Sequence, residues 1–442
     1  MGRIKVLIAT TTWWPSAARL VLAFYRHDAQ VSAICPRGHP LRVLSNMCTV
    51  HTYSAIGPLA ALKRAIREEA PDVIVPTDDR AVGHLHAIHA SAVGDDPGSM
   101  KLRALIERSL GEPEGYVLSG TRDRLLRAVE ADGTRVPTGR SIESVTDLKT
   151  WFAAVPGRCV VKTEGSWGGS GITVVNTLEE AEAAFLRMSK PLSFRQASRI
   201  LLFDRDQFPF MQFLRRERRK VTVQAFIEGR QANIMAVCWK GQVLDTLSVY
   251  VLRAQNGTGA STVIRMLDCP EMEEAAAIVA RRVGSSGFFG LDFMIDNATG
   301  LYYLIEMNPR ATQLGHLKRQ GRDLASSLVR VLGGEPKDAE NLREDDQVLA
   351  LFPQALRFEA NWLEDNPTQI DAPVEEPRLV AELLRRPWTK RSLLARVEGR
   401  LRNNDAYGKV LSSSKAAYLL TELTKQRPDR SGDSAETPLP YP

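Results

Sequence analysis

The sequence has few cysteines and no long hydrophobic run. Its five cysteines contain no Cys-x-x-Cys pair, so the sequence suggests neither a zinc knuckle nor a disulfide framework. No uninterrupted apolar stretch approaches the ~20 residues that a membrane helix needs. The short apolar run at the start, residues 4–9, lacks the cleavage pattern of a signal peptide. We therefore expect a cytoplasmic protein with no membrane insertion.

The sequence lacks two common nucleotide-binding motifs. Its excess of positive over negative charge is also small. No G-x-G-x-x-G follows the first predicted strand, and no Gly-Lys-Ser/Thr is present to form a Walker A loop. Lys and Arg number 58 against 52 Asp and Glu, a net charge of +6. This excess suits an anionic ligand but does not require nucleic acid, so we expect no nucleic-acid partner. The basic segments 215–220 and 385–402 are expected to be solvated faces, with docking of an acidic partner as the alternative.

The chain has the hydrophobic content that is typical of a globular protein. Of its 442 residues, 44% are hydrophobic. Strand and helix signals alternate through its first part, from a strand at 6–9 through a helix at 16–25 to a strand at 73–75. This order predicts a parallel α/β sheet. Ligands of such sheets gather at the carboxyl ends of strands, here the loops 10–12 and 76–79.

A predicted hairpin carries the clearest chemical signal. Segments 290–295 and 301–308 are aromatic and β-branched, and the residues between them have the composition of a turn. Pairing about that turn sets Asp292 opposite Glu306, with Cβ atoms roughly 5 Å apart. Alternation along the second strand is expected to put four side chains on one face: Tyr302, Leu304, Glu306 and Asn308.

Two opposed carboxylates predict a metal site. Like charges directly opposite destabilise a sheet unless a cation lies between them, and the amide oxygen of Asn308 would complete an all-oxygen set suited to Mg²⁺. Arg310, two residues further on, has the charge and reach to hold a transferring phosphoryl group. The alternative is an exposed acidic hairpin.

A glycine-rich segment follows a predicted strand that ends in Lys162. Glycines in the segment 163–171 allow backbone amides to cap phosphate oxygens, and Lys162 lies at its mouth. A flexible hairpin loop is the alternative. Further on, Arg265 ends a polar turn and strand and is a candidate for gripping a substrate carboxylate, with a plain surface arginine as the alternative.

The order of these pieces resembles the ATP-grasp superfamily: a lysine strand, a glycine-rich loop, a strand ending Phe-Ile-Glu-Gly, and Asp followed by Glu-Met-Asn-Pro-Arg. The resemblance covers roughly residues 1–335. It implies an α/β protein with a parallel-sheet domain at 1–110 and an ATP-grasp domain at 111–335. That domain would have a lid lobe at about 135–225 and a metal-binding lobe at about 226–335. We expect a mainly helical extension at 336–425 and a disordered tail at 426–442.

The resemblance also implies roles for individual residues. Lys162 and Arg124 would hold the nucleotide phosphates, and Asp292, Glu306 and Asn308 would bind Mg²⁺ or Mn²⁺. Catalysis would rest on Arg310, Lys162 and Arg265. The remaining ATP contacts would come from the glycine loop (Gly168, Gly169, Ser170 and Gly171), from the hinge (Gln224, Ala225 and Ile227), and from Glu228 or Gln231 at the ribose.

The activity that the resemblance implies is carboxylate activation as an acyl phosphate with Mg-ATP. An amine would then attack, giving an amide and releasing ADP and phosphate. The partners are therefore small carboxylates and amines, and a homodimer is left open. Segment 311–316 departs from the motif of biotin-dependent carboxylases, and carbamoyl-phosphate synthesis normally uses two copies of the unit that occurs once here. Those two reactions, and a non-catalytic ATP-binding module, stay as alternatives.

Overall fold

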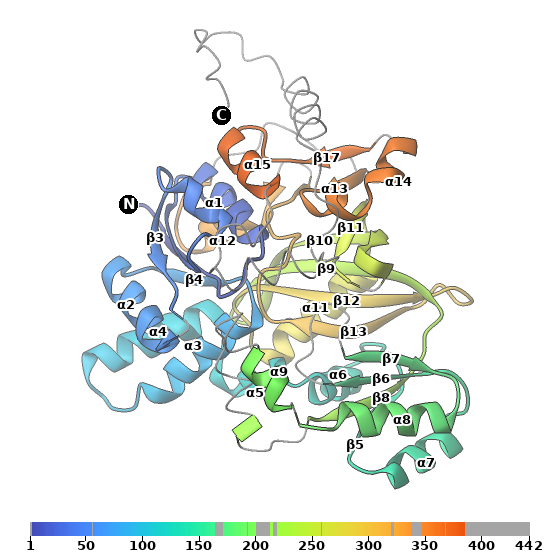
Figure 1. Cartoon of the computed structure of the whole chain (residues 1–442). Coiled ribbons are helices and arrows are strands. Elements are labelled where there is room, and N and C mark those ends of the chain that lie inside the picture. The colour runs from blue at the N-terminus through green and yellow to red at the C-terminus, as the bar shows by residue number, and fades with distance from the viewer. Residues whose placement is uncertain are drawn as a thin grey trace.

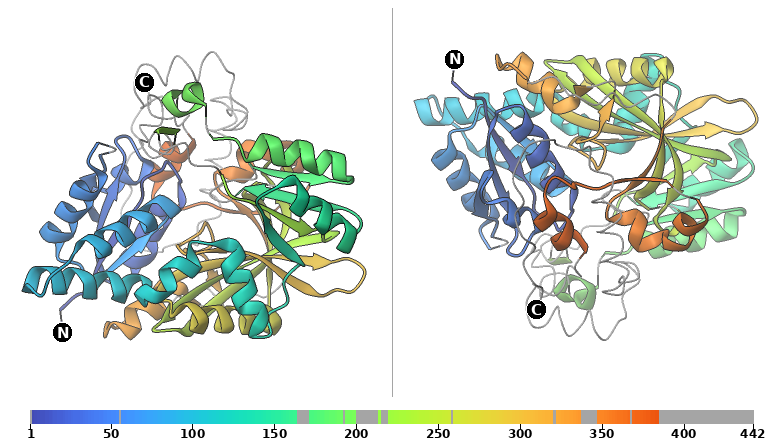
Figure 2. Two further views of the ribbon diagram at one scale, coloured as in Figure 1. Left: turned by 90° about the horizontal axis from the view of Figure 1, so that it is seen from below. Right: turned by 90° about the horizontal axis from the view of Figure 1, so that it is seen from above.

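In a computed structural model of the chain, the described residues form two four-stranded β-sheets, one seven-stranded sheet and one two-stranded sheet, and the three larger sheets lie side by side (Figure 1). The structure describes residues 2–54, 56–163, 171–191, 193–199, 213–214, 219–257, 259–319, 322–336, 347–366 and 368–384. In both views of Figure 2 the N-terminal sheet and its helices lie apart from the smaller sheet of residues 139–225, with the large sheet next to each. No helix in the described residues combines the length and the apolar character needed to cross a membrane.

The N-terminal domain has the predicted parallel sheet, in the order β3-β2-β1-β4. Its elements are β1 (Lys5–Ala9), α1 (Ser16–Arg26), β2 (Gln30–Cys35), β3 (Cys48–Thr52), α2 (Pro58–Glu69), β4 (Val73–Pro76), α3 (Asp79–Ser91) and α4 (Pro97–Leu110). The loops after β1 and β4 meet as expected, because Asp78 accepts hydrogen bonds from the backbone N–H and the hydroxyl of Thr11 at 2.6 and 2.7 Å.

The smaller sheet, β5-β8-β6-β7, lies in the segment expected to be the lid lobe, and we keep that name for it. It follows α5 (Tyr116–Ser119) and α6 (Arg122–Ala131), and its elements are β5 (Gly139–Ile142), α7 (Val145–Ala154), β6 (Cys159–Thr163), β7 (Ile172–Val175), α8 (Leu178–Met188), α9 (Phe194–Arg199) and β8 (Val221–Ala225). Strands β6 and β7 are an antiparallel hairpin whose connection is the glycine-rich segment. A separate core, which includes Trp151, Val161, Phe185 and Val223, fills this lobe.

The large sheet has seven strands in the order β13-β12-β9-β10-β11-β16-β17. Its strands are β9 (Gly229–Trp239), β10 (Gln242–Ala254), β11 (Ser261–Leu267), β12 (Gly287–Asp296), β13 (Tyr302–Asn308), β16 (Val348–Leu351) and β17 (Gln369–Asp371). The helices of this part of the chain are α11 (Pro270–Val283), α12 (Leu324–Val331), α13 (Gln354–Phe358), α14 (Ala360–Asp365) and α15 (Pro377–Leu384), and β14 (Lys318–Arg319) pairs with β15 (Arg322–Asp323) as a separate two-stranded sheet. Strands β16 and β17 belong to the expected helical extension, so part of that extension completes the sheet. The rest of the expected extension, from residue 385 to 425, and the expected tail lie outside the described residues.

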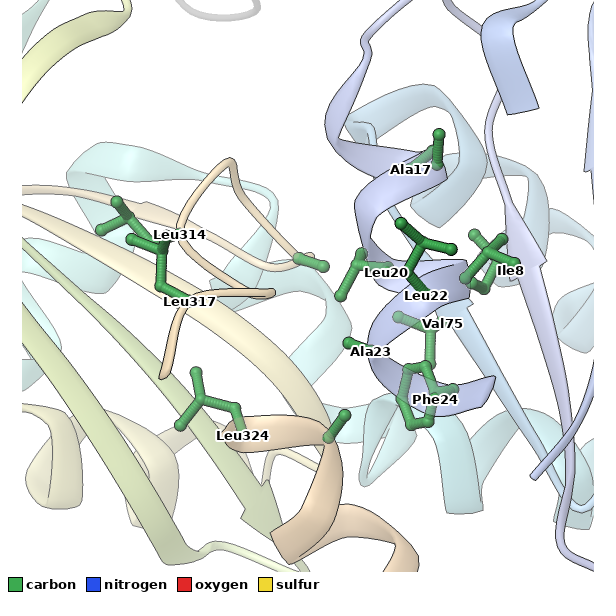
Figure 3. Packing of buried hydrophobic residues seen from close by; sticks show 14 of the residues in the cluster. Ile8, Ala17, Leu20, Leu22, Ala23, Phe24, Val75, Leu314, Leu317 and Leu324 are labelled. Atoms are coloured by element: carbon green, nitrogen blue, oxygen red, sulfur yellow. The ribbon is translucent and has the colours of Figure 1, made fainter. Parts of the chain in front are cut away.

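Helix α1 fixes the N-terminal domain to the large sheet. Figure 3 shows Leu20 on the side of α1 that faces Leu314 and Leu317, in the loop that follows β13. Phe24 meets Phe288 of β12 edge to face, with ring centroids 6.1 Å apart. All five side chains belong to one buried core, and burying apolar surface of this kind contributes about 25 cal/mol per Å². The loop that begins with Pro309 and Arg310 is therefore held from both sides.

Candidate active site

Strands β12 and β13 bring Asp292 and Glu306 together. The two residues are direct partners in the antiparallel register, as the sequence predicted. A β-bulge follows, because Phe293 pairs with Leu304 and so leaves Ile305 without a partner. The expectation that Leu304 shares the face of Glu306 is therefore wrong: the extra residue reverses the alternation, and Leu304 and Met307 both pack in the core beneath.

Asp292 is held by two amides. Asn233 of β9 donates from Nδ2 to Oδ1 of Asp292, and Asn308 donates from Nδ2 to its Oδ2 at 3.1 Å. Burial raises the pKa of Asp292 to about 6, with a further contribution from the neighbouring charge of Glu306. Sequence reasoning missed Asn233, although a lone amide in the apolar run 232–238 was a usable signal.

Arg310 lies where the hairpin meets the N-terminal domain. Its Nη2 donates to Oδ1 of Asn308 at 3.0 Å, and its Nε donates to Oδ1 of Asp79, the first residue of α3, at the same distance. The structure thus brings Arg310, Asn308 and Asp292 into one connected group, as predicted. It also adds Asp79, which the sequence placed only in a loop that reaches ligands.

Arg122, which the sequence analysis did not single out, lies against Glu306. Its Nη2 is 2.5 Å from Oε1 of Glu306, and only 12% of its side chain is exposed. Arg124, the predicted phosphate contact, is exposed on α6. Helical spacing explains the difference, because Arg122 precedes the buried Leu125 and Leu126 by three and four residues and so shares their inward face. The same spacing could have shown from the sequence that Arg122 faces inward, but not that it meets Glu306.

Lys162 extends from β6 of the lid lobe toward this group. It is 5% exposed, and its Nζ donates to Oε1 of Gln224 at 2.6 Å. Burial, together with the neighbouring charge of Arg122, lowers the pKa of Lys162 to about 8, although the charges of Glu306 and Asp292 act in the opposite direction. The lysine of the lid therefore lies within electrostatic range of the carboxylates of the large sheet.

The glycine-rich segment is described only at its end. Gly171 adopts a left-handed φ of 84°, and its carbonyl accepts the N–H of Thr163 at 3.0 Å, which closes the base of the β6–β7 connection. The predicted contacts Gly168, Gly169 and Ser170 lie outside the described residues.

The predicted hinge links the lid lobe to the large sheet. Gln224 uses its side chain to hold Lys162, and the backbone N–H of Ala225 donates to Thr138 O at 2.8 Å. Of the three predicted hinge residues, Ile227 lies in the short link between β8 and β9. The two candidates for the ribose contact lie in different positions. Glu228 is exposed beside the hinge. Gln231 precedes Asn233 by two residues, so both side chains lie on the same face of β9.

Arg265 does not join this group. In the large sheet Asn233 pairs with Val249 of β10 as well as with Asp292, so these three share one face. Arg265 pairs with the next residue, Tyr250, and its side chain is exposed. Because side chains alternate along a strand, Arg265 lies on the face opposite the carboxylates.

The donor set fits a magnesium nucleotide better than a closed metal cage. In the described part of the chain no cluster of three or more His, Cys, Asp and Glu side chains could hold a metal ion. The site instead offers two carboxylates and amide oxygens, a set that leaves room for the phosphate ligands Mg²⁺ usually keeps. Nε and Nη1 of Arg122 are buried and find no hydrogen-bond partner among the described residues. Such donors suit an incoming anion, because leaving them unpaired costs about 1–3 kcal/mol each.

Comparison with known proteins agrees with this geometry. The family model of the ATP-grasp domain matches residues 123–313. The chain contains an ATP-grasp domain. The matched segment runs from the second residue of α6 to the loop after β13, and so includes Lys162, the hinge and both carboxylates. Among solved structures of similar fold is the biotin carboxylase domain of the Hydrogenobacter thermophilus 2-oxoglutarate carboxylase, solved with MgADP, ADP and bicarbonate.

The similarity to individual proteins is distant. The chain is 26% identical over 195 residues to the [butirosin acyl-carrier protein]–L-glutamate ligase of Niallia circulans, which covers 43% of each chain. The Hydrogenobacter domain is 17% identical with a TM-score of 0.53, covering 77% of this chain and 72% of that one. The N5-carboxyaminoimidazole synthetase of Staphylococcus aureus, solved with ADP, is 15% identical with a TM-score of 0.54, covering 82% and 87%. The chain spans less than half the length of the curated relatives it matches.

Proposed function

We propose that this ATP-grasp protein is a ligase that activates a carboxylate as an acyl phosphate with Mg-ATP and joins it to an amine. The observation that carries the proposal is the register pair of Asp292 and Glu306 with three cationic side chains around it. Lys162 approaches from the lid lobe, Arg122 from α6, and Arg310 from the loop after β13. A curated relative named as a ligase of L-glutamate and an acyl-carrier protein supports a ligation reaction of a small carboxylate.

Charge is the main obstacle to this reaction, and the site is built to reduce it. A carboxylate that attacks the γ-phosphoryl group brings two negatively charged groups together, so positioning and neutralisation are the chief requirements. Mg²⁺ on Asp292, Glu306 and Asn308 would supply the larger part of the neutralisation. Lys162, Arg122 and Arg310 are positioned to hold phosphate oxygens on the remaining sides, as donors in charge-assisted hydrogen bonds.

The nucleotide base would lie at the link between the two lobes. The N–H groups of Ala225 and Phe226 are taken by Thr138 O and Arg158 O at 2.8 and 3.0 Å. We therefore place the adenine edge at Ile227, the next residue of the hinge. Gln231 on the metal face of β9 is then the better placed of the two ribose candidates, since Glu228 lies exposed beside the hinge.

Product analysis tests the proposal directly. Free amino acids and small carboxylates would be supplied in pairs with Mg-ATP, and nucleotide products separated by chromatography. We expect ADP and phosphate to accumulate only when both members of a pair are present, because the acyl phosphate is consumed by the amine. Accumulation of AMP with pyrophosphate would refute an acyl-phosphate route.

The same screen separates the alternatives. Bicarbonate and ammonia among the substrates would reveal a carboxylase or a reaction like carbamoyl-phosphate synthesis. Nucleotide binding without ADP release for any pair would instead indicate a non-catalytic ATP-binding module. Equilibrium dialysis with radiolabelled ATP measures binding without any need for turnover.

A further inference from the structure

Arg122 holds Glu306, one of the two carboxylates of the proposed metal site. The two residues are 184 positions apart in the chain, and α6 brings the guanidinium onto the edge strand β13. The Nη2 contact of 2.5 Å uses one edge of the guanidinium. Asp292 has its own partners in Asn233 and Asn308, so both carboxylates of the pair are engaged by donors of the protein itself.

The other donors of Arg122 have no use in this state. Nε and Nη1 are both buried, and neither finds a hydrogen-bond partner within the described ranges. Together they carry three N–H groups in the planar arrangement that matches phosphate oxygens. A buried guanidinium that pairs through one nitrogen only is therefore incomplete until an anion with several oxygens arrives.

The charges of the group balance before any ligand binds. Asp292 and Glu306 contribute two negative charges, and Lys162 and Arg122 contribute two positive ones, while Arg310 is neutralised by Asp79. A divalent cation alone would leave an excess of positive charge and would have to displace the guanidinium from Glu306. A metal that arrives with a nucleotide brings its own negative charge and offers oxygens to the displaced guanidinium.

We propose that Arg122 is an internal counter-cation that occupies Glu306 until the metal nucleotide binds, and then transfers to the nucleotide phosphates. It is a positioning residue that makes metal binding depend on nucleotide binding. This inference rests on the proposed function only in assuming that a magnesium nucleotide is the ligand. It does not depend on which acid or amine reacts.

The test is a Mn²⁺ titration followed by electron paramagnetic resonance, with and without ADP. Wild-type protein should bind Mn²⁺ weakly alone and far more tightly with ADP. Arg122→Gln should bind Mn²⁺ alone about tenfold more tightly and Mn²⁺ in the presence of ADP about tenfold more weakly, so the coupling between the two ligands falls by about 100-fold. Arg122→Lys should keep part of the coupling, because a compact cation can still neutralise Glu306.

Arg127→Gln is the matched control, because Arg127 lies on the exposed face of the same helix with 62% of its side chain accessible. It should leave both titrations unchanged, and thermal unfolding of each variant confirms that the fold is intact. If a folded Arg122→Gln protein keeps the wild-type coupling between Mn²⁺ and ADP binding, the role of Arg122 is overturned but the proposed function is not. Failure of wild-type protein to bind Mn²⁺ with ADP would overturn both this inference and the proposed function, and coupling without turnover would overturn only the catalytic part of that function.

Discussion

Arg310 Nε lies 3.0 Å from Oδ1 of Asp79, although 231 residues separate the two in the chain. The contact joins the loop after the hairpin of Asp292 and Glu306 to the first turn of α3 in the N-terminal domain. Through its Nη2 the same guanidinium reaches Asn308 at 3.0 Å. Arg310 therefore links the proposed phosphoryl site to a neighbouring domain, and its two contacts can be separated by mutation.

Arg310→Ala and Asp79→Asn should differ in their effects. If Arg310 acts on the transferring phosphoryl group, Arg310→Ala should lower ADP release by at least about 100-fold, the scale of losing a preorganised charged donor. Asp79→Asn removes only a half-exposed ion pair and should change ADP release by less than tenfold and the free energy of unfolding by about 0–1 kcal/mol. Equal losses in the two variants would show that Arg310 only joins the domains.

Glu306→Gln should abolish ATP consumption while the fold survives. The amide keeps an acceptor for Arg122 Nη2 and relieves the like charge opposite Asp292, so the melting temperature should change little. It also removes one of two carboxylates from the proposed metal site. Phosphate release at the wild-type rate would contradict the assignment of Glu306, and circular dichroism controls for unfolding.

Nucleotide binding should take up protons near pH 8.5. Burial and the charge of Arg122 hold the pKa of Lys162 at about 8, so the ligand-free lysine is largely neutral above that pH. A bound phosphate raises this pKa, and the complex therefore gains a fraction of a proton at about pH 8.5 and almost none at about pH 6. Calorimetry of ADP binding in buffers of different ionisation enthalpy measures the uptake. Lys162→Met should remove it, and uptake that persists in Lys162→Met would assign the proton to another group.

His39 should make stability depend on pH. Its Nδ1 accepts the N–H of Leu41 at 3.0 Å and its Nε2 donates to Trp14 O at 3.1 Å, an arrangement that requires the neutral ring. Burial lowers the pKa of His39 to about 4, below that of the unfolded chain near 6.5. The unfolded state therefore binds the proton first, and stability from this residue is complete above about pH 6.5 and falls by up to about 3 kcal/mol as pH drops toward 4. Urea unfolding of wild-type and His39→Gln protein at several pH values should show a smaller slope in the variant.

Gly229 begins β9 directly after the hinge and should not tolerate a side chain. A Cβ there would lie 1.8 Å from the carbonyl oxygen of Ile295 on the neighbouring strand. Gly229→Ala must therefore move β9 away from β12, and it should destabilise the protein by about 1–3 kcal/mol and weaken ADP binding. Gly83→Ala is the control, because nothing lies within 4 Å of its added Cβ and alanine favours a helix. A Gly229→Ala variant with wild-type stability and wild-type ADP affinity would contradict the close approach of the two strands.

Local pattern was enough to predict the hairpin of Asp292 and Glu306, the β6–β7 hairpin with Lys162 at its end, and the parallel N-terminal sheet. Strand alternation and turn composition act over a few residues, so a sequence displays them directly. The same local reasoning failed at Ile305. A bulge costs one unpaired residue, and nothing in the strand composition marks where it falls.

The amino-acid sequence by itself determined which residue types stand in which strands, and so the carboxylate pair, the lysine strand and the family resemblance. Only the tertiary structure decided their partners: Arg122 rather than Arg124 at Glu306, Asn233 at Asp292, Asp79 at Arg310, and Arg265 on the opposite face. These contacts join segments 59 to 231 residues apart. The physical reason is that long-range pairing depends on how whole sheets and helices pack, and that packing is set by the summed burial of the cores rather than by any one motif.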